Sequence, residues 1–232
     1  MKNIEELIVK GNKWQFNLRD EADQSVFNEI FKLHEYRRAD EVIQNATDPI
    51  VDVGAHAGFF VMHAHSLNSR VKIFAIEPEP KNIKALQKHL KENKISKVEI
   101  IEAALALETS SRQLVVAPDS HNHRLGLDFD RIPGSVQVRA VSFADLLKQN
   151  KIKKVSLLKM DIEGGEYEVF DGMSEKDLSV VNYIILEYHE SREKSKEIEE
   201  KLRASGFGVQ VFPSKFDKTM GFMFAHNKRF KD

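Results

Sequence analysis

The sequence predicts an α/β protein built on a doubly wound, mostly parallel sheet. From Pro49 onward, short apolar runs rich in β-branched residues alternate with segments of helical periodicity, as in strands joined through helices. The first run leads into a turn with two glycines, IVDVGAHAGFF at 50–60. Later runs end in carboxylates, at the sheet edge where open α/β folds bind ligands. The 232 residues suit one domain with a sizeable core.

The N-terminal part is expected to form a flank or lid on this core. Residues 14–18 read as a short strand, and residues 20–44 carry apolar side chains at near-helical spacing with charges between them. We therefore divide the chain into a strand and helical flank at 1–47 and a core at 48–232.

The first half of the core alternates between strand and helix. The apolar runs predict strands at 50–53, 71–76 and 98–101, with helices from about Gly58 and over 81–93 between them. Pro78 stops the second strand, because proline cannot continue the hydrogen-bonded ladder. Two strands at 112–117 and 136–140 surround a polar loop and predict an inserted β-hairpin at about 111–140.

The second half repeats the pattern and then closes the sheet. Ser142 with Asp145 predicts a capped short helix. Strands at 155–160 and 183–186 frame a helix from about Glu163, and a charged helix over 190–204 ends at Gly206. The runs at 207–212 and 220–225 are expected to pair as an antiparallel end of the sheet.

The spacing in the glycine turn favours a cofactor without phosphates at this point. A dinucleotide fingerprint reads G-x-G-x-x-G, and its middle glycine lets the backbone approach a pyrophosphate. Here the outer Gly54 and Gly58 are present, but His56 stands in the middle. Glu77, at the end of the next strand, can accept the hydroxyls of a ribose. Glu77 would serve either cofactor, but the absent middle glycine makes a nucleoside without phosphates fit this turn better than NAD.

A second group of polar residues follows the later strands. LLKMDIEGGEYEVF at 157–170 places Asp161, Glu163 and Glu166 after an apolar strand, and IILEYH at 184–189 adds Glu187 and His189 on one strand face. Crowded carboxylates repel one another, so such clusters persist where a cation or a proton transfer requires them. Glu166 alone is equally well explained as an acid stabilised by a helix N-terminus.

At this point four segments together resemble the FkbM family of S-adenosylmethionine-dependent methyltransferases. They are IVDVGAHAGFF, FAIEPEPKN, KMDIEGGEYEVF and IILEYH, in this order, and the resemblance covers roughly 14–225. It implies the seven-stranded, Rossmann-like sheet of class I methyltransferases, S-adenosyl-L-methionine as cofactor, and mostly O-methylation of a hydroxyl on a small molecule or sugar. The chain departs from the family pattern at His56, where asparagine is more common, and at Leu107-Glu108, which replaces a glycine-rich turn.

The resemblance also implies roles for individual residues. Asp52, Gly54 and Gly58 would shape the methionine end of the cofactor, Glu77 would hold its ribose, and Glu102 with Ala103 would lie along the adenine. The full set of expected cofactor contacts is Asp52, Gly54, Ala55, His56, Gly58, Glu77, Pro78, Glu102, Ala103 and Asp161.

Methyl transfer to a hydroxyl requires a general base near the methyl group. Asp161, at the end of the strand nearest the expected sulfonium, is the first candidate, and His189 is the second, since neutral imidazole acts near physiological pH. Supporting roles near the substrate are expected for Glu163, Glu166, Glu187 and His123. Asp161, Glu163, Glu187 and His189 also offer ligands for Mg²⁺ or Mn²⁺, but their spacing is not a metal signature, so a metal is not favoured and no metal ligand is assigned.

Composition excludes several other classes of protein. With 35 Lys and Arg against 36 Asp and Glu, the chain has no broad field for nucleic acid or an anionic membrane. It has no cysteine, which removes disulfides, zinc–thiolate sites and thiol nucleophiles. No signal-peptide core or membrane-span window is found, so we expect a cytoplasmic protein acting on a small hydroxylated molecule, of unknown oligomeric state. The alternatives kept open are an NAD-dependent dehydrogenase and a cofactor-binding, non-catalytic scaffold.

Overall fold

A computed structural model describes residues 3–9, 11–115, 124–126, 135–189, 192–214, 217 and 219–230. Its centre is a seven-stranded sheet of order β12-β13-β11-β10-β3-β4-β5. The strands that follow one another from the middle to one edge are β3 (Ile50–Val53), β4 (Ile73–Ile76) and β5 (Val98–Ile101). On the other side lie β10 (Val155–Met160), β11 (Val181–Tyr188), β13 (Gly221–Asn227) and β12 (Phe207–Pro213).

The strand directions confirm the predicted fold class. From β5 through β11 all neighbours are parallel, whereas β13 pairs antiparallel with both β11 and β12. The central strands β3, β4 and β10 are buried along their whole length, which explains why their sequences are mostly apolar. The predicted bounds of β3, β5 and β10 agree with the structure at both ends.

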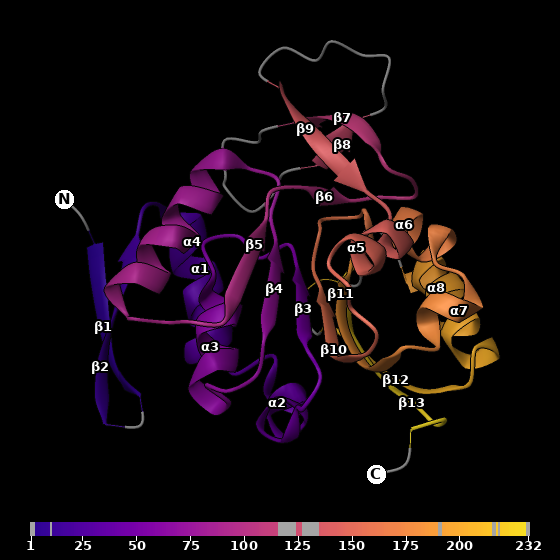
Figure 1. Cartoon of the computed structure of the whole chain (residues 1–232), viewed down its shortest axis with the longest axis horizontal. Helices are drawn as coiled ribbons and strands as arrows, with labels where there is room; N and C mark the ends of the chain where they lie inside the picture. Colours follow the sequence, from indigo (N-terminus) through magenta and orange to yellow (C-terminus); the bar gives the residue numbers. More distant parts are fainter. Residues whose placement is uncertain are drawn as a thin grey trace.

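Helices cover both faces of the sheet (Figure 1). One face packs against α3 (Phe59–Leu67) and α4 (Pro80–Glu92). The other packs against α5 (Phe143–Gln149), α6 (Glu166–Gly172), α7 (Glu175–Leu178) and α8 (Arg192–Ala204). The short α7 was not predicted, although Ser174 begins it with a capping box to Asp177.

The N-terminal segment consists of more and shorter elements than the sequence predicts. It contains β1 (Asn3–Val9), β2 (Asn12–Leu18), α1 (Glu21–Phe31), a 3-10 turn at Arg37–Ala39 and α2 (Asp40–Asn45). The prediction of one helix over 20–44 is therefore wrong. The chain leaves α1 after Phe31 and reverses at His34, whose φ of +53° no helix interior allows. Strand β1, which pairs with β2, was also not predicted.

Aromatic packing joins this segment to the core. The ring of Phe27 on α1 lies 5.0 Å from that of Phe16 on β2 and 6.2 Å from that of Phe59 on α3, measured between centroids. All three side chains are almost fully buried. The N-terminal helix thus shares its hydrophobic core with one face of the central sheet.

A small second sheet lies beyond the carboxyl ends of the central strands (Figure 1). Its order is β6-β9-β7-β8, with β6 at Ala104–Leu105, β7 at Ser110–Val115, β8 at Arg124–Gly126 and β9 at Ser135–Val141. β7 and β9 pair antiparallel, and β6 joins β9 directly after β5. His123, a predicted substrate-side residue, lies outside the described residues.

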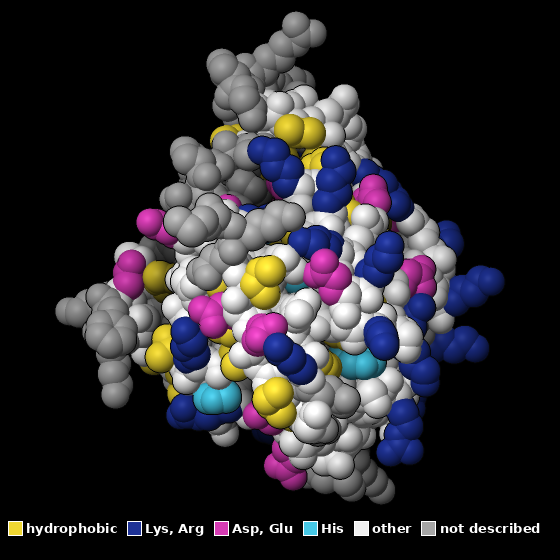
Figure 2. Space-filling view, turned by 90° about the vertical axis from the view of Figure 1, so that its left-hand side faces the viewer, with side chains coloured by type: hydrophobic (Ala, Val, Ile, Leu, Met, Phe, Trp, Pro, Cys, Tyr) yellow, Lys and Arg dark blue, Asp and Glu magenta, His cyan; other side chains and the backbone are white. Residues whose placement is uncertain are grey.

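The surface carries side chains of both charges (Figure 2), and the described helices are too short or too polar to span a membrane. On the side of the molecule seen in Figure 2, Lys and Arg gather toward one edge and Asp and Glu lie among and beside them. Among the described helices, none combines the length and the hydropathy required to cross a bilayer.

Replacing Phe27 with alanine tests the shared core. Loss of a buried phenylalanine typically costs about 3–5 kcal/mol, because transfer and cavity terms add. We expect Phe27→Ala to lower the free energy of unfolding by this amount in one cooperative urea transition. Leu33→Ala, at a position 60% exposed, is the matched control and should change it by less than about 0.5 kcal/mol. An equally small effect at Phe27 would contradict a shared core.

Candidate active site

The turn between β3 and α3 depends on two glycines for different reasons. Gly54 has φ of +76°, and a Cβ there would lie 1.9 Å from the backbone oxygen of Asp161. Gly58 has φ of +87°, and its Cβ would lie 2.2 Å from Leu86 Cδ1 on α4. The first glycine therefore lets two loops touch, and the second lets α3 begin against its neighbouring helix.

His56, at the position of the missing middle glycine, also has a positive φ, +51°. Its backbone N–H donates to Glu77 Oε2 at 2.8 Å. Its ring turns toward the start of α1, where Nε2 lies 3.3 Å from an Arg19 nitrogen and 3.5 Å from Asp23 Oδ1. The imidazole thus links the glycine turn to the N-terminal segment.

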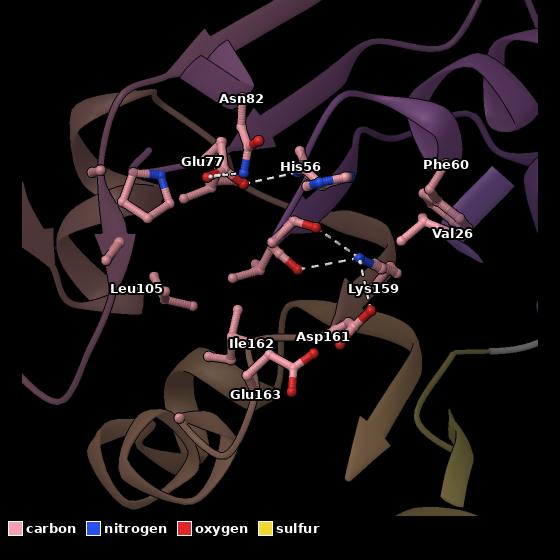
Figure 3. A pocket seen from close by; sticks show the side chains of 18 of the residues that line it. Val26, His56, Phe60, Glu77, Asn82, Leu105, Lys159, Asp161, Ile162 and Glu163 are labelled. Carbon is pink, nitrogen blue, oxygen red and sulfur yellow. Dashed lines mark hydrogen bonds and ion pairs between the residues drawn. The ribbon is translucent and has the colours of Figure 1, made fainter. Parts of the chain in front are cut away.

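Glu77 is held at the end of β4 by three donors. Besides the N–H of His56, it accepts from the Glu79 N–H at 2.9 Å and from Asn82 Nδ2 at 3.3 Å (Figure 3). Burial raises the pKa of its carboxyl to about 7, against the opposing effect of these hydrogen bonds. The carboxylate is fixed in one orientation and still lines the cavity beside it.

A buried ion pair lies directly behind the glycine turn. Lys159 on β10 and Asp52 on β3 are register partners, and Lys159 Nζ lies 3.2 Å from Asp52 Oδ1. Asp52 is 0% and Lys159 3% exposed. Burial lowers the pKa of Lys159, but Asp52 and then Asp161 outweigh it and raise that pKa, whereas burial raises the pKa of Asp52. Lys159 Nζ also donates to the Gly54 carbonyl at 2.9 Å, which anchors the turn.

The acidic turn after β10 is closed by Glu166. Its carboxylate accepts from the N–H groups of Ile162 and Gly164, both at 2.9 Å. This turn also contains Glu163, with φ of +56°. The helix predicted from about Glu163 therefore begins only at Glu166, because the intervening residues form a loop around that carboxylate.

His189 lies among the carboxylates of this turn. Its Nδ1 donates to Glu166 Oε1 at 3.2 Å, and its Nε2 lies 3.9 Å from Asp161 Oδ1 and 3.7 Å from Glu163 Oε2. Burial lowers the pKa of this imidazole, but Glu166, Asp161 and Glu163 outweigh it and raise the pKa to about 10. Burial and Asp161 raise the pKa of Glu163 to about 7 and that of Glu187 well above its usual value.

Most of these residues face one cavity of about 400 Å³ (Figure 3). Of the predicted site residues, those that line it are Gly54, Ala55, His56, Glu77, Pro78, Ala103, Asp161 and Glu163. The others do not line it. Asp52 lies behind the wall, Gly58 caps α3, Glu102 is exposed, and Glu166, Glu187 and His189 lie around the acidic turn.

Sequence reasoning missed three residues of this site. Lys159 lines the cavity and pairs with Asp52, and its signal was a charge inside an apolar strand, LLKM. Tyr36, almost fully buried, donates its hydroxyl proton to Asp161 Oδ2 at 3.3 Å. Asn82 fixes Glu77. Tyr36 gives no signal in the sequence, because it follows the reversal at His34 that the helical pattern conceals.

Comparison with known sequences shows that the chain is similar to methyltransferases. The family described as Methyltransferase FkbM domain matches residues 52–227. The chain is 27% identical over 176 residues to the hexuronic acid methyltransferase AglP of Haloferax volcanii, covering 72% of this chain and 68% of that protein. It is 26% identical over 215 residues to the 31-O-demethyl-FK506 methyltransferase FkbM of Streptomyces tacrolimicus, covering 80% and 82%.

Solved structures agree at the level of the fold. An rRNA methylase from Streptococcus thermophilus gives a TM-score of 0.51 at 8% identity, covering 83% of this chain and 96% of that one. The fibrillarin pre-rRNA processing protein of Methanococcus jannaschii gives 0.51 at 15% identity, covering 98% and 83%. At these identities the likeness concerns the arrangement of helices and strands alone.

Removing one member of the buried ion pair should destabilise the protein strongly, and removing both charges should restore much of the lost stability. Lys159→Met leaves the Asp52 carboxylate buried without its cation, which typically costs about 3–5 kcal/mol. We expect that loss in urea unfolding, and we expect the double variant Lys159→Met with Asp52→Asn to recover much of it. Strictly additive effects of the two substitutions would show that the pair is not coupled.

The raised pKa of His189 predicts a pH-dependent contribution to stability. Because the folded pKa of about 10 lies above the unfolded value of 6.5, the stabilisation is complete below pH 6.5 and is lost as the pH rises toward 10. In metal-free buffer, His189→Gln should therefore destabilise the protein more at pH 6 than at pH 10. Urea titrations at both pH values measure this, and a pH-independent difference would contradict the assignment.

Proposed function

The chain belongs to the FkbM methyltransferase family, and from that premise we propose that it transfers the methyl group of S-adenosyl-L-methionine to a hydroxyl of a small molecule or sugar. One observation carries the proposal: the glycine turn, Glu77 and Asp161 face the same cavity from three consecutive strand ends of the sheet. The acceptors in the names of two relatives, a hexuronic acid and 31-O-demethyl-FK506, support a small oxygen-bearing substrate.

The residues around the cavity suit this cofactor. Glu77 is fixed by the N–H groups of His56 and Glu79 and leaves acceptor capacity for a ribose diol. His56 fills the place where a pyrophosphate would require glycine, which fits a cofactor without phosphates. Ala103, after β5, leaves room for a flat base, and Gly54 with Ala55 would hold the methionine end. When bound, S-adenosylmethionine supplies a methyl group on a good leaving group.

The chain's own contribution is positioning and proton removal. Asp161 lines the cavity, and the Tyr36 hydroxyl and Lys159 Nζ lie 3.3 and 3.9 Å from its Oδ2. These two groups fix the orientation of the carboxylate. In the proposed reaction, this carboxylate accepts the proton of the acceptor hydroxyl as the oxygen forms its bond to the methyl carbon. The Nδ1 of His189 is held by Glu166, and its Nε2 lies 3.9 Å from Asp161 Oδ1, so we assign His189 to positioning Asp161 and not to the base.

Asp161→Asn separates catalysis from cofactor binding. Because the amide cannot accept the hydroxyl proton, we expect kcat to fall by about 10²–10⁴-fold. The Kd for S-adenosylhomocysteine, measured by calorimetry, should change by less than about tenfold, because the Glu77 side of the site is intact. Glu77→Gln is the matched variant and should weaken S-adenosylhomocysteine more than it lowers kcat.

A thermal-shift comparison tests the cofactor itself. S-adenosylhomocysteine should raise Tm with its concentration, since a ligand that binds only the folded state stabilises it. NAD should not. Stabilisation by NAD alone would overturn the proposed function in favour of a dehydrogenase.

A further inference from the structure

Three side chains beside the cavity converge on one point. Asp161 at the end of β10, Glu187 on β11 and His189 just after it each present a ligand atom, and these atoms all lie within 4.8 Å of one another. The alternation of the strand places Glu187 and His189 on the same face. Atoms this close can contact a single ion at ordinary metal–ligand distances.

The Glu187 carboxylate and the Nε2 atom of His189 have no hydrogen-bond partner among the described residues. The side chain of Glu187 is half-buried, and its carboxylate accepts no hydrogen bond from a described residue. His189 is 8% exposed, and no described residue lies within hydrogen-bond distance of its Nε2. These atoms are therefore available to a ligand or to water.

The orientation of His189 is a separate observation that also indicates a ligand. Its Nδ1 is held by Glu166 Oε1 at 3.2 Å, and Glu166 is itself fixed by the N–H groups of Ile162 and Gly164. Nε2 therefore faces the carboxylates of Asp161 and Glu163, at 3.9 and 3.7 Å. A carboxylate behind a histidine, with the other ring nitrogen directed into a group of oxygen ligands, is the usual support of a metal-bound imidazole.

We propose that Asp161, Glu187 and His189 form a site for a divalent cation, of the class of Mn²⁺, at the acceptor side of the cavity. Two carboxylates and one imidazole suit such an ion and leave coordination positions for water or substrate oxygens. Binding of the cation does not depend on the proposed function. Its role does rest on it: the ion would hold the acceptor through a hydroxyl pair and lower the pKa of the attacking hydroxyl. One Asp161 oxygen can bind the ion while the other accepts the proton.

Binding of Mn²⁺ alone, followed by the loss of its free electron paramagnetic resonance signal, tests the site. We expect one ion per chain in the wild type. Glu187→Gln and His189→Gln should each raise the Kd by at least about tenfold, as the loss of a ligand does. Glu35→Gln is the matched control. It removes a nearby acid that acts on Asp161 through charge but offers no ligand atom, so its effect should be about twofold.

Three outcomes would overturn the proposal: no loss of free Mn²⁺ signal in the wild type, unchanged affinity in Glu187→Gln, or an equal effect of Glu35→Gln. A separate calorimetric titration of each variant with S-adenosylhomocysteine, with EDTA present to remove metal, verifies that the variant is folded. It also separates the two proposals, because normal S-adenosylhomocysteine binding without Mn²⁺ binding would reject the cation site and leave the proposed function intact.

Discussion

The buried ion pair between Lys159 and Asp52 is the interaction on which the rest of the site depends. The two residues face each other across adjacent parallel strands, where apolar side chains would satisfy the core at lower desolvation cost. The pair instead fixes the positions of the loops that it contacts. Lys159 Nζ also holds the Gly54 carbonyl and approaches Asp161, so one ammonium group connects the turn after β3 with the turn after β10. Gly54 permits this contact, because any Cβ would meet the Asp161 backbone.

Around that fixed point, the acidic turn concentrates negative charge in a partly buried space. Glu166 is satisfied by backbone N–H groups and by His189, whereas Asp161, Glu163 and Glu187 approach one another with few donors between them. Lys159 and His189 offset part of the repulsion between these carboxylates. A sulfonium cofactor or a divalent cation would offset more of it. Burial and then Asp161 raise the pKa values of Glu163 and Glu187, whereas burial lowers the pKa of His189 and the carboxylates around it outweigh burial and raise that pKa.

The sequence predicts the sheet well because its signals are local. Short, mostly apolar runs mark β3, β5 and β10, and the glycines mark the turn that follows β3. The sequence predicts helix boundaries less well where contacts of individual side chains decide the local conformation. The helix expected from Glu163 starts late because Glu166 folds back on the loop, and the helix over 20–44 breaks at His34. Asp52 lies behind the cavity because Lys159 pairs with it, a contact between strands about a hundred residues apart that no local window contains.

Crystals grown with S-adenosylhomocysteine test the central claim most directly, namely that the turns after β3, β4 and β10 form one methyl-donor site. Electron density should place the ribose hydroxyls against Glu77, the amino-acid end along Gly54 and Ala55, and the sulfur on the Asp161 side of the cavity. Density for the ligand elsewhere on the protein, or a ribose without contact to Glu77, would contradict it.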